Sequence, residues 1–188
     1  MLSNVYTLIA ELWCNPQDVD MHELKRNAEG WLGHLAQIDP ETTHLLAQFM
    51  RTPITEEEYI ELFELNPRCP LYLGSHVFEE PKTCAQAAVS DRNNYMIELL
   101  GIYRHFGFVP NGKELPDYLP LMVEFLALTA GSEDPLREKF IRENLMPFLP
   151  PLRSRLEELG TPFLYLLDAL ERVLKLDIGA SKSEVNNV

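Results

Sequence analysis

Apolar residues recur at helical spacing from one end of this sequence to the other, and this pattern limits the folds that the chain can adopt. Near the N-terminus, Val5, Leu8, Ile9 and Leu12 fall on one face of a helix. The same spacing returns between successive breaks at proline or glycine, and no segment alternates convincingly between apolar and polar residues. We therefore expect an all-α fold, a single-domain multi-helix bundle.

The length of the chain is compatible with one domain. Its 188 residues, 46% of them apolar, are enough to form a hydrophobic core. No internal repeat occurs at a fixed period, which argues against a solenoid. We expect the helical domain to span residues 1–178 and residues 179–188, which lack apolar periodicity, to form a disordered C-terminal tail.

Capping and turn residues predict where the helices begin and end. Asp39-Pro40 reads as an N-cap followed by proline in the first turn. Thr55 and Glu58 have the spacing of a capping box. A long helix is expected from about Ala85 to Phe106, closed by Gly107. Further helices are expected near residues 5–12, 21–38, 40–50, 55–65, 119–130, 134–145, 152–159 and 163–178, with a short helical piece over 72–78.

The charge of the chain argues against several classes of partner. Its net charge is −13 and its isoelectric point is about 4.8. Nucleic acids and anionic lipid surfaces attract basic proteins, so we expect neither nucleic-acid binding nor stable membrane insertion. No apolar stretch is long enough to cross a bilayer, and the first residues lack the basic segment of a secretory signal. We expect a soluble, cytoplasmic protein.

Sequence patterns for catalysis are weak or missing. Cys14, Cys69 and Cys84 are an odd number of cysteines without C-x-x-C spacing, which favours a reducing compartment. Glu41 and His44 form an E-x-x-H pair, but di-iron bundles use this unit twice and no second copy occurs. The sequence also lacks a nucleophile elbow, a P-loop and a dinucleotide-binding glycine motif.

Asp117 and Glu124 are the polar pair that these patterns leave unexplained. They are seven residues apart, so on one helix their carboxylates would face the same way, about 10 Å apart. In one interpretation Asp117 caps the helix and Glu124 pairs with a nearby cation. In the other, the two carboxylates form an acidic groove suited to a peptide with arginines and apolar residues. The expected rim of this groove consists of Tyr72, His76, Phe78, Tyr103 and Tyr118.

The phrase Glu114-Leu115-Pro116-Asp117-Tyr118, together with the run from Leu71 to Phe78 and the later Glu124-Phe125-Leu126, carries a family resemblance. It resembles the NarJ branch of the NarJ/TorD/DmsD proteins, which are assembly chaperones of molybdenum oxidoreductases. The resemblance covers about residues 52–177. The family often has histidine where this chain has Tyr118, so no role that needs an imidazole there is carried over.

The resemblance implies a TorD/NarJ-like helical fold and a function without catalysis. It implies a system-specific cytoplasmic chaperone that binds the N-terminal leader of a molybdenum oxidoreductase catalytic subunit and assists insertion of the molybdenum cofactor. The chaperone itself would hold no cofactor or metal, and cofactor-synthesis proteins are further candidate partners. A helical metalloenzyme or hydrolase, or a permanent helical subunit of a complex, are the alternatives. The expected peptide-binding residues are Tyr72, His76, Phe78, Tyr103, Glu114, Pro116, Asp117, Tyr118 and Glu124.

Overall fold

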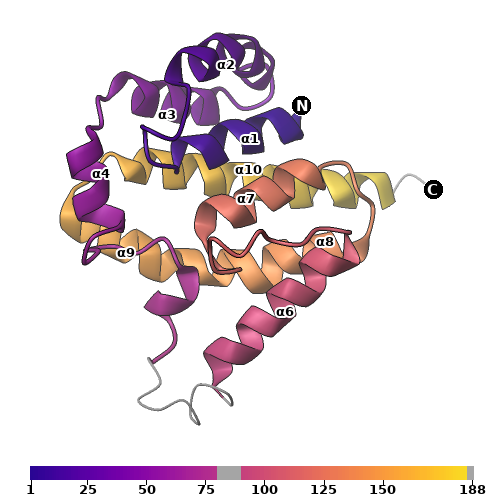
Figure 1. Ribbon diagram of the computed structural model, residues 1–188. Coiled ribbons are helices and arrows are strands. Elements are labelled where there is room, and N and C mark those ends of the chain that lie inside the picture. Colours follow the sequence, from indigo (N-terminus) through magenta and orange to yellow (C-terminus); the bar gives the residue numbers. More distant parts are fainter. Residues whose placement is uncertain (80–89, 186–188) are drawn as a thin grey trace.

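A computed structural model describes the backbone of residues 1–79 and 90–185, and the side chains of these ranges up to residue 179. Within them every regular element is helical, which confirms the expected all-α fold. The long helix α10 (Phe163–Val185), coloured gold to yellow in Figure 1, crosses the middle of the molecule. Helices α3 (Pro40–Arg51) and α9 (Leu149–Leu159) pack against it.

The first helix forms the core together with a helix from the second half of the chain. Helix α1 (Leu2–Leu12) packs closely along α7 (Leu119–Leu128) and also contacts α10. The apolar residues whose spacing predicted α1 are all buried. Helix α2 (Met21–Leu35) follows, and the side chain of Asp20 caps it by accepting hydrogen bonds from two backbone N–H groups of its first turn.

Local capping signals place the next two helices as expected. The carboxylate of Asp39 accepts a hydrogen bond from the N–H of Thr42 and thereby caps α3. Helix α4 (Glu56–Phe63) begins with the predicted capping box, in which Thr55 and Glu58 each bond the other's backbone N–H. These helix starts depend on residues close in sequence, which is why the sequence predicts them.

The middle of the chain contains a single 3₁₀ turn and one long helix within the described ranges. The turn η1 (Leu73–His76) lies inside the range where a short helical piece was expected. Helix α6 (Asp91–His105) is capped by the hydroxyl of Ser90 and ends before Gly107, whose φ of 82° is the left-handed conformation expected there. The expected helix start near Ala85 lies outside the described residues.

Beyond α7 the chain stays helical, but the type of helix changes from α to π and then to 3₁₀. Helix α8 (Pro135–Lys139) is capped by Asp134 and continues into a π turn, η2 (Phe140–Leu145), and a 3₁₀ turn, η3 (Met146–Phe148). The prolines near residue 150 were expected to break the chain. Instead they lie in η3 and in the first turn of α9, where a missing N–H costs little.

The last helix differs from the expectation at both ends. The pattern Thr161-Pro162 predicts a cap for α10, but the hydroxyl of Thr161 finds no hydrogen-bond partner among the described residues and so does not cap the helix. Helix α10 runs to Val185 and so extends into the range 179–188 that was expected to be a tail. No proline follows Pro162, and the backbone continues its hydrogen-bond ladder without interruption.

The two described cysteines behave as core side chains. Cys69 is buried and Cys14 half-buried, and both are free thiols. Burial raises the pKa of Cys14 to about 11 and the pKa of Cys69 to about 12. Both therefore stay protonated and weakly nucleophilic near neutral pH. Cys84 lies outside the described residues.

Candidate functional site

The region of the Glu114–Tyr118 phrase is held to η1 by a short antiparallel contact. Tyr72 and Tyr118 form an isolated β-bridge. On either side of it, the N–H of Leu73 donates to the carbonyl of Asp117 at 3.0 Å, and the N–H of Leu119 donates to the carbonyl of Leu71 at 2.9 Å. This clasp brings together two segments that are more than forty residues apart in the sequence.

Asp117 lies at the centre of the clasp and does not cap a helix. Helix α7 begins two residues later, and its N-cap residue, Tyr118, makes no side-chain capping bond. The Asp117 side chain is fully buried, and its Oδ2 accepts a hydrogen bond from the N–H of Gly74 at 2.9 Å. A Cβ at position 74 would lie 2.9 Å from this oxygen, so the close approach requires glycine. The predicted cap is therefore wrong, and Asp117 instead holds η1.

The surroundings of Asp117 disfavour its charged form. Burial raises the pKa of this carboxyl, and the Gly74 N–H and the positive charge of Arg92 offset only part of that effect. The second oxygen, Oδ1, has no hydrogen-bond partner among the described residues. The neutral carboxylic acid is thus favoured relative to an exposed aspartate.

The side chains of the two bridge residues, Tyr72 and Tyr118, form a partly exposed cluster with Glu114. The hydroxyl of Tyr72 donates to Oε2 of Glu114 at 2.5 Å, and the rings of Tyr72 and Tyr118 lie 5.4 Å apart. All three side chains are half-buried. Burial raises the pKa of Tyr118 to about 12, although its hydrogen bond with Tyr59 lowers it. This cluster places one hydrogen-bonded carboxylate and two aromatic rings at the partly exposed surface.

Four predicted site residues do not line one open rim. They are Tyr103, Pro116, His76 and Phe78, and they contact the segments 70–78 and 116–118 or neighbouring helices. The buried Tyr103 donates its hydroxyl to the carbonyl of Pro116 at 2.7 Å. The ring of His76 bonds the carbonyl of Pro70 through Nε2, also at 2.7 Å. Phe78 packs on Tyr95, with ring centroids 5.7 Å apart. We conclude that these side chains stabilise the 70–78 and 116–118 segments.

Glu124 is exposed on α7 and lies apart from Asp117. Because Asp117 precedes the helix and points inward, the expectation that the two carboxylates share one helix face is wrong. Glu124 instead borders a pocket of about 250 Å³ whose other walls include Leu128, Val109 and Tyr103, so the structure brings the two predicted residues Tyr103 and Glu124 together. The sequence predicted this carboxylate but not its apolar neighbours from the loop before Asn111.

Sequence reasoning also missed a buried ion pair between α8 and α10. The guanidinium of Arg137 binds both carboxylate oxygens of Asp177, at 2.9 and 2.7 Å. Oδ2 of Asp177 also accepts the hydroxyl of Tyr6 at 2.7 Å, which ties α1 to the same carboxylate. The partners lie forty or more residues apart, and no local pattern could have revealed them.

Two broader features of the described chain bear on function. Its His, Cys, Asp and Glu side chains form no group of three or more that could hold a metal ion. In the same ranges, every helix is too short or too polar to cross a bilayer.

Comparison with known proteins places this fold in a family. The nitrate reductase delta subunit family matches residues 38–167, more than half of the chain. The chain is 31% identical over 148 residues to the nitrate reductase molybdenum cofactor assembly chaperone NarJ of Escherichia coli K12. It is 31% identical over 133 residues to the probable assembly chaperone NarW of the same strain, and 32% identical over 127 residues to the probable NarJ of Bacillus subtilis 168.

These alignments cover most of the chain but a smaller part of each relative. They include 76%, 70% and 68% of this chain, and 58%, 52% and 62% of the three relatives in the same order. The chain thus spans little more than half the length of the curated relatives that it matches. The family match and these identities agree with the phrases around Asp117 that resemble the NarJ branch. The chain belongs to the nitrate reductase delta subunit family.

Proposed function

We propose that this protein is a cytoplasmic assembly chaperone for a molybdenum oxidoreductase of the nitrate reductase type. It binds the N-terminal leader of the catalytic subunit and holds that subunit while the molybdenum cofactor is inserted. The proposal is supported by the relatives, which are named as molybdenum cofactor assembly chaperones of nitrate reductase. In this proposal the chain binds a polypeptide and makes or breaks no covalent bond.

The observation that carries the leader-binding part is the surface around Glu124. This exposed carboxylate forms no ion pair with any described residue. Beside it, Val109 and Leu128 are 76% and 59% exposed and line the same pocket of about 250 Å³. Large apolar side chains exposed together are typical of an interaction surface, and an unpaired carboxylate suits an arginine of the partner.

Glu114 supplies a second acidic contact in this proposal. Its carboxylate is held by the Tyr72 hydroxyl, so it loses little conformational entropy when it binds a guanidinium. Tyr72 and Tyr118 then provide faces on which arginine stacks. Asp117 acts indirectly, because its bond to Gly74 fixes the segment that carries Tyr72. Tyr103, Pro116, His76 and Phe78 position the same segments.

The test is isothermal titration calorimetry with a synthetic peptide that covers the leader of a nitrate reductase catalytic subunit. Glu124→Gln and Glu114→Gln should each weaken binding by about ten- to hundredfold, because a hydrogen bond to a charged group contributes roughly 1.5–3 kcal/mol. Glu29→Gln is the matched control, since it removes an exposed carboxylate from the surface of α2. Equal affinity of all three variants and the wild type would reject the leader site.

A permanent subunit is the alternative that co-purification separates from a chaperone. A chaperone binds the immature catalytic subunit and leaves the mature enzyme. We therefore expect the tagged protein to retain the catalytic subunit from cells that cannot make the molybdenum cofactor, and to lose it from cells that can. Stoichiometric retention in both cases would show a permanent subunit.

A further inference from the structure

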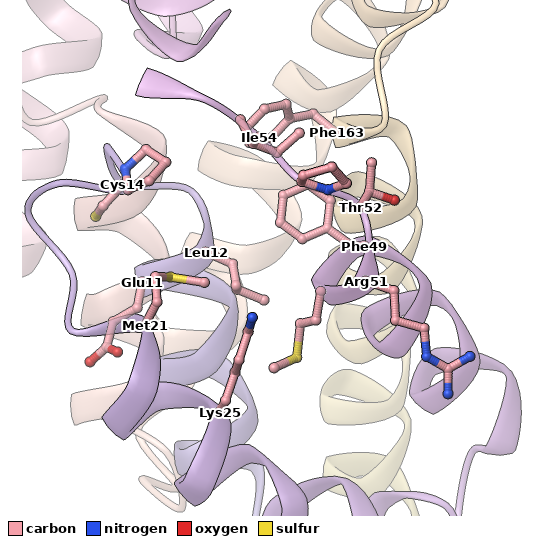
Figure 2. A pocket seen from close by; sticks show the side chains of 13 residues that line it. Glu11, Leu12, Cys14, Met21, Lys25, Phe49, Arg51, Thr52, Ile54 and Phe163 are labelled. Carbon is pink, nitrogen blue, oxygen red and sulfur yellow. The ribbon is translucent and has the colours of Figure 1, made fainter. Parts of the chain in front are cut away.

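A second pocket lies at the C-terminal end of α1. It has a volume of about 300 Å³ and is enclosed by the end of α1, the start of α2, the end of α3 and the segment after α3 (Figure 2). Its walls are mainly apolar, formed by Leu12, Met21, Phe49, Met50, Ile54 and Phe163. This size is at the lower limit of small-molecule sites, and it accommodates one or two large apolar side chains.

The pocket combines a rigid floor with adaptable walls. Leu12, Phe49 and Phe163 are buried and belong to the hydrophobic core. Met21 and Met50 are half-buried at the pocket edge. Methionine is flexible and polarizable, so it can adjust to the shape of a guest side chain. Such walls are common at surfaces that bind peptides.

Charges of both signs surround this apolar pocket. In Figure 2 the Lys25 side chain reaches toward Leu12, while the Glu11 carboxylate and the Arg51 guanidinium lie on opposite sides. None of the three charged side chains forms an ion pair within the described ranges. By contrast, exposed Lys139 of α8 pairs with carboxylates of neighbouring helices.

From this arrangement we infer that the pocket binds a peptide segment in which large apolar side chains lie between a basic and an acidic residue. The apolar side chains enter between Met21 and Met50. The basic residue lies by Glu11, and the acidic residue lies by Lys25 and Arg51. Charge complementarity on both sides therefore sets which peptide binds and in which direction. The inference does not depend on the leader site, which uses other residues.

The protein carries its own reporter for this site. Trp13 is buried and stacks on Phe163, a pocket wall, with ring centroids 5.3 Å apart. A guest side chain that displaces Phe163 slightly changes the environment of Trp13. In a Trp31→Phe background, Trp13 is the sole tryptophan, and its fluorescence measures occupancy of the pocket.

The experiment uses the full chain and a short helical peptide with two leucines one turn apart, flanked by an arginine and a glutamate. Two double-mutant cycles test the charge contacts: Glu11→Gln against the peptide arginine changed to glutamine, and Lys25→Gln against the peptide glutamate changed to glutamine. We expect each cycle to give a coupling of about two- to fivefold in Kd, as partly exposed ion pairs do. Met50→Trp should fill the pocket and abolish binding, and its binding is measured by calorimetry because this variant adds a second tryptophan.

Control variants distinguish binding in this pocket from nonspecific attraction between charges. Glu29→Gln and Lys113→Gln, both exposed and outside the pocket lining, should show no coupling to the peptide. Met50→Trp lies outside the Glu124 pocket and should leave leader binding unchanged while it abolishes binding of this peptide, so the two proposals fail separately. Absence of coupling, or equal binding of a peptide with serines in place of the leucines, overturns the inference. So does self-association in sedimentation that Met50→Trp abolishes, because a second copy would then occupy the pocket.

Discussion

Arg137 and Asp177 form a two-pronged ion pair in the interior, with nitrogen–oxygen distances of 2.9 and 2.7 Å. The two side chains are 6% and 9% exposed, and Arg137 makes further bonds to the hydroxyl of Thr129 and the carbonyl of Leu126. The guanidinium thus links α8 to α10 and to the end of α7. A buried charge that loses its partner lowers the stability of the folded protein strongly.

Removing one member of this pair should cost more than removing both. We expect Asp177→Leu to lower the free energy of unfolding by about 3–5 kcal/mol, because it leaves Arg137 charged and buried. The double variant Arg137→Met with Asp177→Leu should be much closer to the wild type. Urea denaturation followed by circular dichroism measures both values. If the double variant is as unstable as the sum of the singles, the pair does not act as a unit.

The contact between Gly74 and Asp117 predicts opposite effects for two glycine substitutions. Gly74→Ala places a Cβ 2.9 Å from Oδ2 of Asp117 and should lower the free energy of unfolding by about 1–3 kcal/mol. Gly101→Ala lies on the exposed face of α6, where a Cβ meets nothing within 4 Å. It should raise that free energy by up to about 1 kcal/mol. Equal effects at both positions would mean that the clasp tolerates a side chain.

Because the pKa of Asp117 is raised in the folded protein, the contribution of this carboxyl to stability falls as the pH rises. Between the ordinary aspartate pKa, about 3.9, and the higher folded value, the folded protein binds more protons than the unfolded chain. This contribution is present below about pH 4 and is lost as the pH rises through the folded pKa. Asp117→Asn removes it, so the variant should gain stability relative to the wild type as the pH rises above about 4. A difference that stays constant across this range would contradict the assignment.

Asp39 should show the opposite dependence in acid. Burial opposes ionisation of this carboxylate, but Arg172 and Thr42 bind it and lower its pKa to about 2. The stabilisation is present above the unfolded pKa and is lost as the pH falls from about 4 toward about 2. Arg172→Met should therefore flatten the loss of stability in this interval, as measured by denaturation at a series of pH values. The same slope in both proteins would show that Arg172 has no such role.

The sequence predicted those parts of the structure that depend on neighbours along the chain. The capping box of Thr55 and Glu58, the cap at Asp39 and the left-handed Gly107 are each set within a few residues. The apolar periodicity predicted α1 because a helix buries one face regardless of what covers it.

Contacts between distant residues could not be predicted in the same way. The sequence pattern predicts that Asp117 caps the next helix, but α7 begins two residues later and the side chain bonds Gly74, forty-three positions earlier. The residues next to Asp117 in the sequence do not indicate that its partner is Gly74. The exposed apolar group around Val109 and the pocket by Met50 arise from the packing of several elements, so they appear only in three dimensions.

The clasp between Tyr72 and Tyr118 has a consequence for how this fold can vary. It joins the two ends of the chain segment from residue 74 to residue 116, whose helix α6 is anchored separately where the Tyr95 hydroxyl donates to the carbonyl of Asn144. The entropy cost of closing a loop grows only with the logarithm of its length, so each doubling costs roughly 0.6 kcal/mol. Insertions in the mostly exposed loop 109–113 should therefore cost little stability, because α6 and the clasp still hold the two ends of that loop.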